Sequence, residues 1–161
     1  MELWGTAENW QLLDLEFSAR TPSEALRASS RALGAGLRRL LRASAPEQNL
    51  LVWQAILPAP HHPLVLGAGC AMFGGTPELA ARAAVLGICT APASAAIRLL
   101  GLDPYAVHAV LAELGSEIDD LSLASVPTGG FGVAGLPSNG APALDLLADY
   151  HLTKEVRLFA S

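Results

Sequence analysis

The chain has 161 residues, of which 52% are hydrophobic and only 16% are charged, and its formal net charge is −5. This composition excludes a disordered protein, which needs low hydrophobicity and high charge, and it gives no general attraction to nucleic acid or to an anionic membrane. The length is typical of a single domain spanning residues 1–161. Because so few charges cannot cover a solitary domain, we expect an oligomer or a subunit of a complex.

The first 44 residues predict one clear helix. Residues 1–20 carry only a weak helical signal. Thr21-Pro22 then predicts a helix start with Thr21 as the N-cap, and the helical pattern continues to Ser44. One side of this helix is rich in leucine, and its basic face carries Arg27, Arg31, Arg38 and Arg42. Two glycines inside it are expected to weaken it by about 1 kcal/mol each, Gly34 and Gly36.

The middle of the chain predicts a short buried helix. Residues 47–59 form a connector whose apolar stretch could be helical. The pair His61-His62 lies among three prolines, which break regular structure there. From Leu64 to Phe73 the sequence favours a short buried helix, which Gly74-Gly75 ends.

A longer apolar helix is expected to follow. Thr76-Pro77 predicts its start, the pattern reaches about Leu100, and Pro92 is expected to kink it. The helix is apolar nearly all round, which is typical of a helix at the centre of a bundle. Its uncharged run, residues 83–97, is 15 residues long and too short for a membrane span, which takes about 20.

The last third of the chain predicts an acidic helix, a loop and a final helix. Asp103-Pro104 starts a helix whose apolar spacing continues to Leu121. An acidic stripe along it carries Glu113, Glu117 and Asp120. Residues 126–140 hold five glycines and two prolines, which is typical of a surface loop, and a last helix is expected from about Ala141 to Lys154. Together these elements predict an all-α fold, a compact helical bundle around the central apolar helix.

Charge is unevenly distributed along the chain. Segment 20–44 has six arginines and one glutamate, a local charge of +5, while segment 103–120 has five acidic residues and no lysine or arginine, a local charge of −5. Each segment could meet a partner, lie in solvent, or face the other inside the fold. Arg98 lies in the apolar helix, where an unpaired buried charge would cost several kcal/mol. We therefore expect Arg98 to pair with a carboxylate or to reach the surface.

Residues able to carry chemistry are few. Cys70 and Cys89 are expected to pack in the apolar core, and so small a number of cysteines favours a reduced, cytoplasmic compartment. The N-terminus lacks the features of a signal peptide, and no nucleophile-elbow, zinc-protease or phosphate-loop motif occurs. One histidine of the adjacent pair is expected to bond at the start of the next helix. The alternative is a small metal- or ligand-binding module, or an enzyme, that uses His61, His62 and His108.

Several segments in fixed order resemble UreF-type urease accessory proteins. They are HHPLVLG at 61–67, PASAAIRLLGLDP at 92–104, the helix EALRASSRALGAGLRRL at 24–40, and the ending with RLFAS at 157–161. The resemblance covers roughly residues 20–161. It implies an all-α, non-enzymatic assembly factor that forms a homodimer and binds a UreD/UreH-type protein. That pair would recruit a UreG-type GTPase and deliver nickel to apo-urease, with no cofactor and no tightly bound metal in this chain.

The resemblance also implies where partners bind. The closing residues that would order on a partner are Tyr150, His151, Arg157, Leu158, Phe159 and Ser161. Further candidates for partner or dimer surfaces are Arg27, Arg31, Arg38 and Arg98. The family normally opens with several tens of residues that have no counterpart before Met1, so the expectation is a truncated or divergent member. A degenerate paralogue without maturation activity is the alternative.

Overall fold

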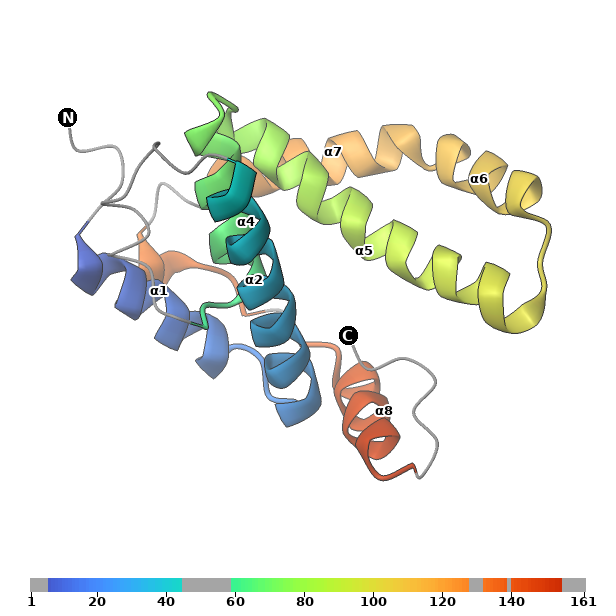
Figure 1. Cartoon of the computed structure of the whole chain (residues 1–161), viewed down its shortest axis with the longest axis horizontal. Helices are drawn as coiled ribbons and strands as arrows, with labels where there is room; N and C mark the ends of the chain where they lie inside the picture. Colours follow the sequence, from blue (N-terminus) through green and yellow to red (C-terminus); the bar gives the residue numbers. More distant parts are fainter. Residues whose placement is uncertain (1–5, 45–58, 128–131, 139, 155–161) are drawn as a thin grey trace.

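The computed structural model describes residues 6–44, 59–127, 132–138 and 140–154, and its regular elements there are all helical (Figure 1). This confirms the predicted all-α class. The elements in chain order are α1 (Ala7–Ala19), α2 (Glu24–Ser44), α4 (His62–Met72), α5 (Pro77–Leu100), α6 (Pro104–Glu113), α7 (Gly115–Ser125), the short 3-10 helix η2 (Val133–Gly135) and α8 (Pro142–Leu152). The apolar stretch of the connector, which could be helical, and the tail 155–161 lie outside the described residues.

Helices α1, α2 and α4 form the body of the molecule, with α4 lying along α2 (Figure 1). The buried apolar cluster within it is small, Val65, Ala68 and Met72 of α4. Trp10 of α1 and two leucines of α2 pack against this cluster. The predicted short buried helix is thus confirmed, and Gly74, with a φ of 77°, lies directly beyond its end.

Gly34 allows α2 and the start of α4 to approach each other closely. A Cβ atom added at Gly34 would lie 2.1 Å from the carbonyl oxygen of Pro60 and 3.0 Å from the amide nitrogen of His62. The second glycine of this helix, Gly36, has open space at the same place. Gly34 therefore has a packing role that its low helix propensity does not reveal.

The start of α2 differs from the prediction by two residues. The N-cap is Ser23, whose Oγ accepts a hydrogen bond from the amide of Leu26 at 3.1 Å. The Thr21 hydroxyl instead donates to the carbonyl of Phe17 at 2.9 Å, at the end of α1. Both residues are suitable caps, and the tertiary contacts of Ser23 decide between them.

Helices α5, α6 and α7 form a long hairpin that projects from the body (Figure 1). The predicted caps are confirmed: Thr76 accepts from the amide of Leu79 at 3.3 Å, and Asp103 accepts from the amide of Tyr105 at 3.0 Å. The single helix predicted over 103–121 is wrong, because the chain breaks at Leu114, with ψ near 1°, before Gly115. Glycine is a poor helix former, so it provides a place for such a break.

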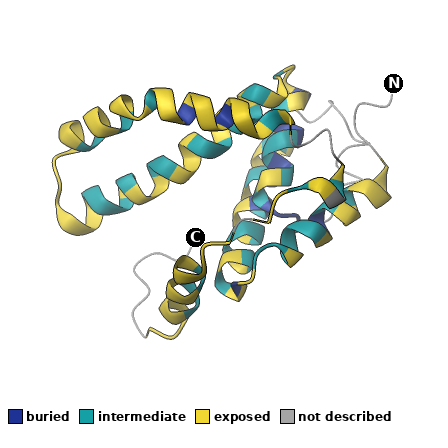
Figure 2. Ribbon diagram, turned by 180° about the vertical axis from the view of Figure 1, so that it is seen from behind, coloured by how far each residue is buried: buried dark blue, intermediate teal, exposed yellow. Residues whose placement is uncertain are grey.

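The apolar helix α5 is less covered than its sequence predicts. It packs against α4, α6 and α7, which agrees with a central place in the fold, yet none of its residues is buried in the single chain (Figure 2). The prediction that α5 is buried is wrong for a single copy, because the neighbouring helices cover only part of the circumference of α5. Among the described residues α5 alone is long and apolar enough to cross a membrane, a test that core helices of soluble proteins also pass.

Candidate interaction site

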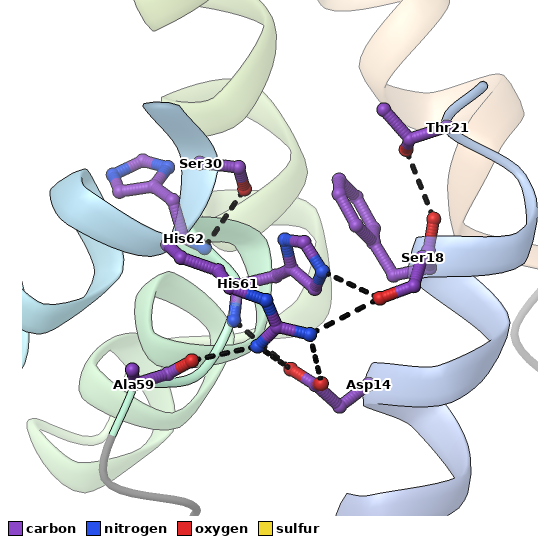
Figure 3. A network of polar contacts seen from close by, with 9 residues as sticks. Asp14, Ser18, Thr21, Ser30, Ala59, His61 and His62 are labelled. Carbon is purple, nitrogen blue, oxygen red and sulfur yellow. Dashed lines mark hydrogen bonds and ion pairs between the residues drawn. The ribbon is translucent and has the colours of Figure 1, made fainter. Parts of the chain in front are cut away.

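A network of polar contacts joins α1, α2 and the start of α4 (Figure 3). The guanidinium of Arg31 donates to the carboxylate of Asp14 at 2.7 Å, to the hydroxyl of Ser18 at 3.1 Å and to the carbonyl of Ala59 at 2.7 Å. The same carboxylate accepts from the backbone amide of His61 at 3.1 Å. Asp14 is nearly fully buried, and these charged and backbone donors compensate the loss of water around it.

His61 lies at the centre of this network, with none of its surface exposed. Its Nε2 lies 2.9 Å from the Ser18 hydroxyl, its ring contacts Phe17 at a centroid distance of 4.5 Å, and its Nδ1 has no partner among the described atoms. Burial, followed by the nearby charge of Arg31, lowers the pKa of His61, and the carboxylate of Asp14 opposes this only in part. The backbone of His61 occupies the N-cap position of α4, but its side chain bonds to α1 and does not cap the helix.

The three histidines of the alternative hypothesis are not brought together. The backbone amide of His62 donates to Ser30 at 3.2 Å, and burial lowers the pKa of its imidazole. His108 is exposed on α6, in the outer part of the hairpin, where it bonds the carbonyl of Pro104 at 2.7 Å (Figure 1). Within the described segments no group of three or more His, Cys, Asp or Glu side chains is placed to hold a metal ion.

The basic face of α2 divides into two parts with different surroundings. In the first part, Arg27 donates to the carbonyls of Thr21 and Pro22, both at 2.6 Å, and Arg31 belongs to the buried network. These internal contacts fix the two side chains in the fold. Their predicted partner-binding role stays a prediction.

The second part of the basic face forms an open hollow of about 350 Å³, which we call the arginine hollow. It is lined by Ala35, Arg38, Arg39 and Arg42. Burial and the neighbouring charge of Arg42 lower the pKa of Arg38. Arg38 is one of the predicted partner-binding residues, whereas Arg39 was not predicted, although its position next to Arg38 was a signal.

The predicted acidic stripe, Glu113, Glu117 and Asp120, is exposed on α6 and α7. Its neighbour Asp119 pairs with Arg82 of α5 at 3.1 Å. The idea that the basic and acidic segments face each other inside the fold is wrong for one copy, because α2 packs on α4 and α8 whereas α6 and α7 pack on α5.

The remaining candidates lie at the surface. Arg98 is exposed in the last turn of α5 and donates to the carbonyl of Ser94 at 3.4 Å, so it has reached the surface, one of its two expected outcomes. Cys70 and Cys89 are free thiols and only half-buried, so the full core burial expected for them is not found. Tyr150 and His151 are exposed on α8. The other tail candidates, Arg157, Leu158, Phe159 and Ser161, lie outside the described residues.

Apolar side chains are also exposed to an unusual extent. Exposed leucine, isoleucine, valine and tyrosine side chains occur along the hairpin and on α8, among them Ile88, Leu100, Tyr105, Leu121 and Leu146. Apolar surface of this extent is typical of a protein that a partner covers.

The comparisons with known proteins agree on one family. The family model UreF matches residues 1–115, which run from the N-terminus to the start of α7. The chain is 41% identical over 149 residues to the urease accessory protein UreF of Mycobacterium sp. strain JLS, and 40% identical over 148 residues to that of Mycobacterium marinum. It is 36% identical over 148 residues to that of Mycobacterium tuberculosis strain H37Rv.

Each of these matches covers 92% of this chain and 65% of the relative, so the chain spans about two thirds of the length of the curated relatives it matches. No solved structure matches. The family model covers more than half of the chain, and its match agrees with the order of motifs seen in the sequence. The chain therefore belongs to the UreF family, whose curated members are named urease accessory proteins.

Proposed function

We propose that this protein is a non-catalytic adaptor in urease maturation. It binds a UreD/UreH-type accessory protein, and the pair recruits a UreG-type GTPase for nickel insertion into apo-urease. The observation that carries the proposal is membership of the UreF family, which the sequence of its relatives supports along 92% of the chain. In this role the chain acts in the cytoplasm, as a dimer, with no cofactor and no tightly bound metal of its own.

The surface of the molecule supports an adaptor role. Its exposed apolar side chains are spread over α5, α6, α7 and α8, and burial of such side chains is the main favourable term in protein association. Polar groups that could cooperate in catalysis, such as His61 and Asp14, are buried in a network in which Asp14 accepts from Arg31 and from the His61 amide, and His61 Nε2 bonds to Ser18. Both features fit a protein that binds other proteins.

We place the UreD/UreH-type partner on α8. This helix exposes Leu144, Leu146, Leu147 and Tyr150, and it contacts the body through α2 alone among the principal helix contacts. The Tyr150 hydroxyl accepts from Lys154 at 2.6 Å, and the ammonium of Lys154 lies 4.1 Å from the ring centroid. The pair presents a tyrosine next to the apolar side chains, and tyrosine is enriched among the residues that contribute most to binding at protein interfaces.

The test is co-purification of the full chain with a tagged UreD/UreH-type protein. We expect a stoichiometric complex, and a Tyr150→Ala variant should bind at least 10-fold more weakly. Tyr105→Ala removes another exposed tyrosine, on α6, and is the control, expected to bind like the wild type. Failure of the wild-type chain to co-purify, or equal losses in the two variants, would contradict the proposal.

The alternative of a degenerate paralogue is separated by a genetic test. The full chain is expressed in cells that lack their own UreF, and urease activity is measured with nickel in the medium. Restored activity supports a maturation factor. Binding of the UreD/UreH-type protein without restored activity would identify a paralogue that retains the partner surface only.

A further inference from the structure

We infer that α1 is a pH-sensitive cover: protonation of the buried His61 imidazole releases α1 from the start of α4 while the other helices stay folded. The inference goes beyond the proposed adaptor function and does not depend on it. It concerns the polar network at the junction of α1, α2 and α4 (Figure 3).

The contacts that hold α1 to the body lie along one face of the helix. Trp10, Asp14 and Ser18 follow one another at intervals of four residues, so their side chains point in similar directions. Trp10 packs against the apolar cluster of α4. Asp14 accepts from Arg31 and from the backbone amide of His61. The hydroxyl of Ser18 bonds to the same two residues, so two of these three positions depend on the bonding around His61.

The hydroxyl of Ser18 fixes the role of each ring nitrogen in the neutral state. Arg31 donates to the Ser18 oxygen at 3.1 Å, and a guanidinium can only donate. The hydroxyl hydrogen of Ser18 is then available to Nε2 of His61, which lies 2.9 Å away. In this arrangement the neutral imidazole accepts at Nε2 and carries its hydrogen on Nδ1.

A second proton on the ring reverses this bond. Nε2 becomes a donor, so the Ser18 oxygen faces two cationic donors, Arg31 and the imidazolium of His61. The hydroxyl hydrogen of Ser18 loses its acceptor at the same time. The Nδ1 hydrogen, now part of a cation, is buried without an acceptor among the described atoms. Protonation therefore weakens the link between α1 and α4.

The charges that face His61 do not compensate a further cation. Arg31 and Arg27 of α2 oppose protonation, and the carboxylate of Asp14 on α1 favours it. That carboxylate is already shared between Arg31 and the backbone amide of His61. The next residue on α4 is His62, which brings no negative charge. Burial, followed by the charge of Arg31, lowers the pKa of His61, so the folded junction disfavours the imidazolium.

The other contacts of α1 allow it to leave before the rest of the fold. The indole Nε1 of Trp10 is a buried donor with no partner among the described atoms, and it would regain a hydrogen bond in water. At the other end of α1, the bonds from Arg20 reach only η2 and its neighbour, at 3.4 Å. Release of Trp10 would uncover Val65 and Met72 of α4, which are both buried in the closed state. Acidity would thereby expose an apolar surface on the body.

The test is native-state hydrogen exchange of the full chain at pH 7.5 and pH 5.5, with and without a low concentration of urea. Protection is expressed relative to the exchange rate of the unfolded peptide at the same pH. We expect α1 to be less protected than α4, with a protection that depends little on urea, because its opening exposes little surface. The lower pH should reduce the protection of α1 by about 5- to 10-fold, since the imidazole of the open state has its ordinary pKa.

Two neighbouring histidines provide the variant and its control. His61→Gln keeps a neutral group that can bond to Ser18, so the effect of pH on the protection of α1 should disappear. His62→Gln, one residue further along, should retain it. A titration of the wild-type imidazoles by nuclear magnetic resonance needs no substitution, and His61 should titrate below the ordinary value of 6.5.

Three results would overturn the inference. The first is one protection and one urea dependence shared by α1 and α4, which would mean that α1 leaves only in global unfolding. The second is a wild-type effect of pH on α1 in His61→Gln, and the third is a His61 imidazole that titrates at or above 6.5. Each of these results would leave the adaptor function intact, because binding of the UreD/UreH-type protein is measured separately.

Discussion

At Gly34 the absence of a side chain allows the carbonyl of Pro60 to lie directly against the α2 backbone. We predict that Gly34→Ala lowers the free energy of unfolding by about 2 kcal/mol, because the added methyl group forces α2 away from the start of α4. Urea unfolding followed by circular dichroism measures the change.

Gly36→Ala is the matched control, two residues further along the same helix. Its Cβ would meet nothing within 4 Å, so this variant should gain about 0.5–1 kcal/mol from improved helix propensity. Equal effects of the two substitutions would mean that Gly34 has no packing role.

The buried imidazole of His61 makes stability depend on pH. Burial and Arg31 lower the pKa of His61 in the folded chain, whereas the unfolded chain has the ordinary value of 6.5. Below pH 6.5 the unfolded state therefore binds more protons, and the free energy of unfolding falls until the pH reaches the lowered folded pKa. Well above pH 6.5 the imidazole is neutral in both states, so His61 no longer makes the free energy of unfolding depend on pH.

We predict that His61→Gln reduces the loss of stability between pH 7.5 and pH 5.5. Burial also lowers the pKa of His62, so His62 should account for a further part of this loss of stability. The double variant with His62→Gln should therefore depend less on pH than His61→Gln alone. His108→Gln, at an exposed position, is the control. A wild-type pH dependence in the His61→Gln variant would refute the role of His61.

At the scale of whole elements, the carboxylate of Asp149 joins α8 to the start of α2. Asp149 accepts from the Ser23 hydroxyl at 2.6 Å and from the backbone amide of Ala25 at 3.0 Å. The hydrogen bond from Ser23, followed by that from the Ala25 backbone, lowers the pKa of Asp149. The contact also places a negative charge at the N-terminus of α2, where the helix dipole favours it.

We predict that Asp149→Ala releases α8 from the body. Amide hydrogen exchange should become faster in α8 and in the first turn of α2, and it should remain unchanged in α4. Asp145→Ala, on the same helix and with no hydrogen bond to α2, should leave the exchange pattern as in the wild type. Unchanged exchange in Asp149→Ala would show that α8 is held by other contacts.

Local sequence signals located most helices, because their caps and stops act within a few residues. Thr76 and Asp103 cap the helices that they predict, and Gly74 lies beyond the end of α4. The break at Leu114 could not be predicted from the apolar spacing, which continues past it. Ser23 could not be preferred over Thr21 as a cap, because its partner Asp149 lies 126 residues away.

The candidate surfaces were predictable only in part. The basic face of α2 follows from helical spacing, whereas the acidic stripe was predicted on one helix and the structure divides it between α6 and α7. Some arginines of this face bond to other parts of the fold, as Arg31 does to Asp14. These bonds join segments that are distant in the sequence. Helical periodicity gives no information about such pairing, so the division of the basic face became visible only in the fold.

For the whole molecule, the thin hairpin leaves apolar side chains in contact with water. Ile88 of α5 is 73% exposed, whereas Met72 of α4 is 8% exposed. At concentrations below dimerisation, Ile88→Gln should change the free energy of unfolding by less than about 0.5 kcal/mol, while Met72→Ala should cost about 2–5 kcal/mol. Ile88→Gln should also bind less of a hydrophobic fluorescent dye. Equal destabilisation would mean that α5 is buried in the monomer.

The ion pair between Arg20 and Glu16 has a further partner far along the chain. The Arg20 guanidinium also donates to the carbonyls of Val133 and Leu136, both at 3.4 Å, which are 113 and 116 residues downstream. During synthesis on the ribosome these two bonds can therefore close only after residues 133–136 have emerged, long after the end of α1. The corner of the molecule that α1 and η2 form is completed late, although α1 itself is made early.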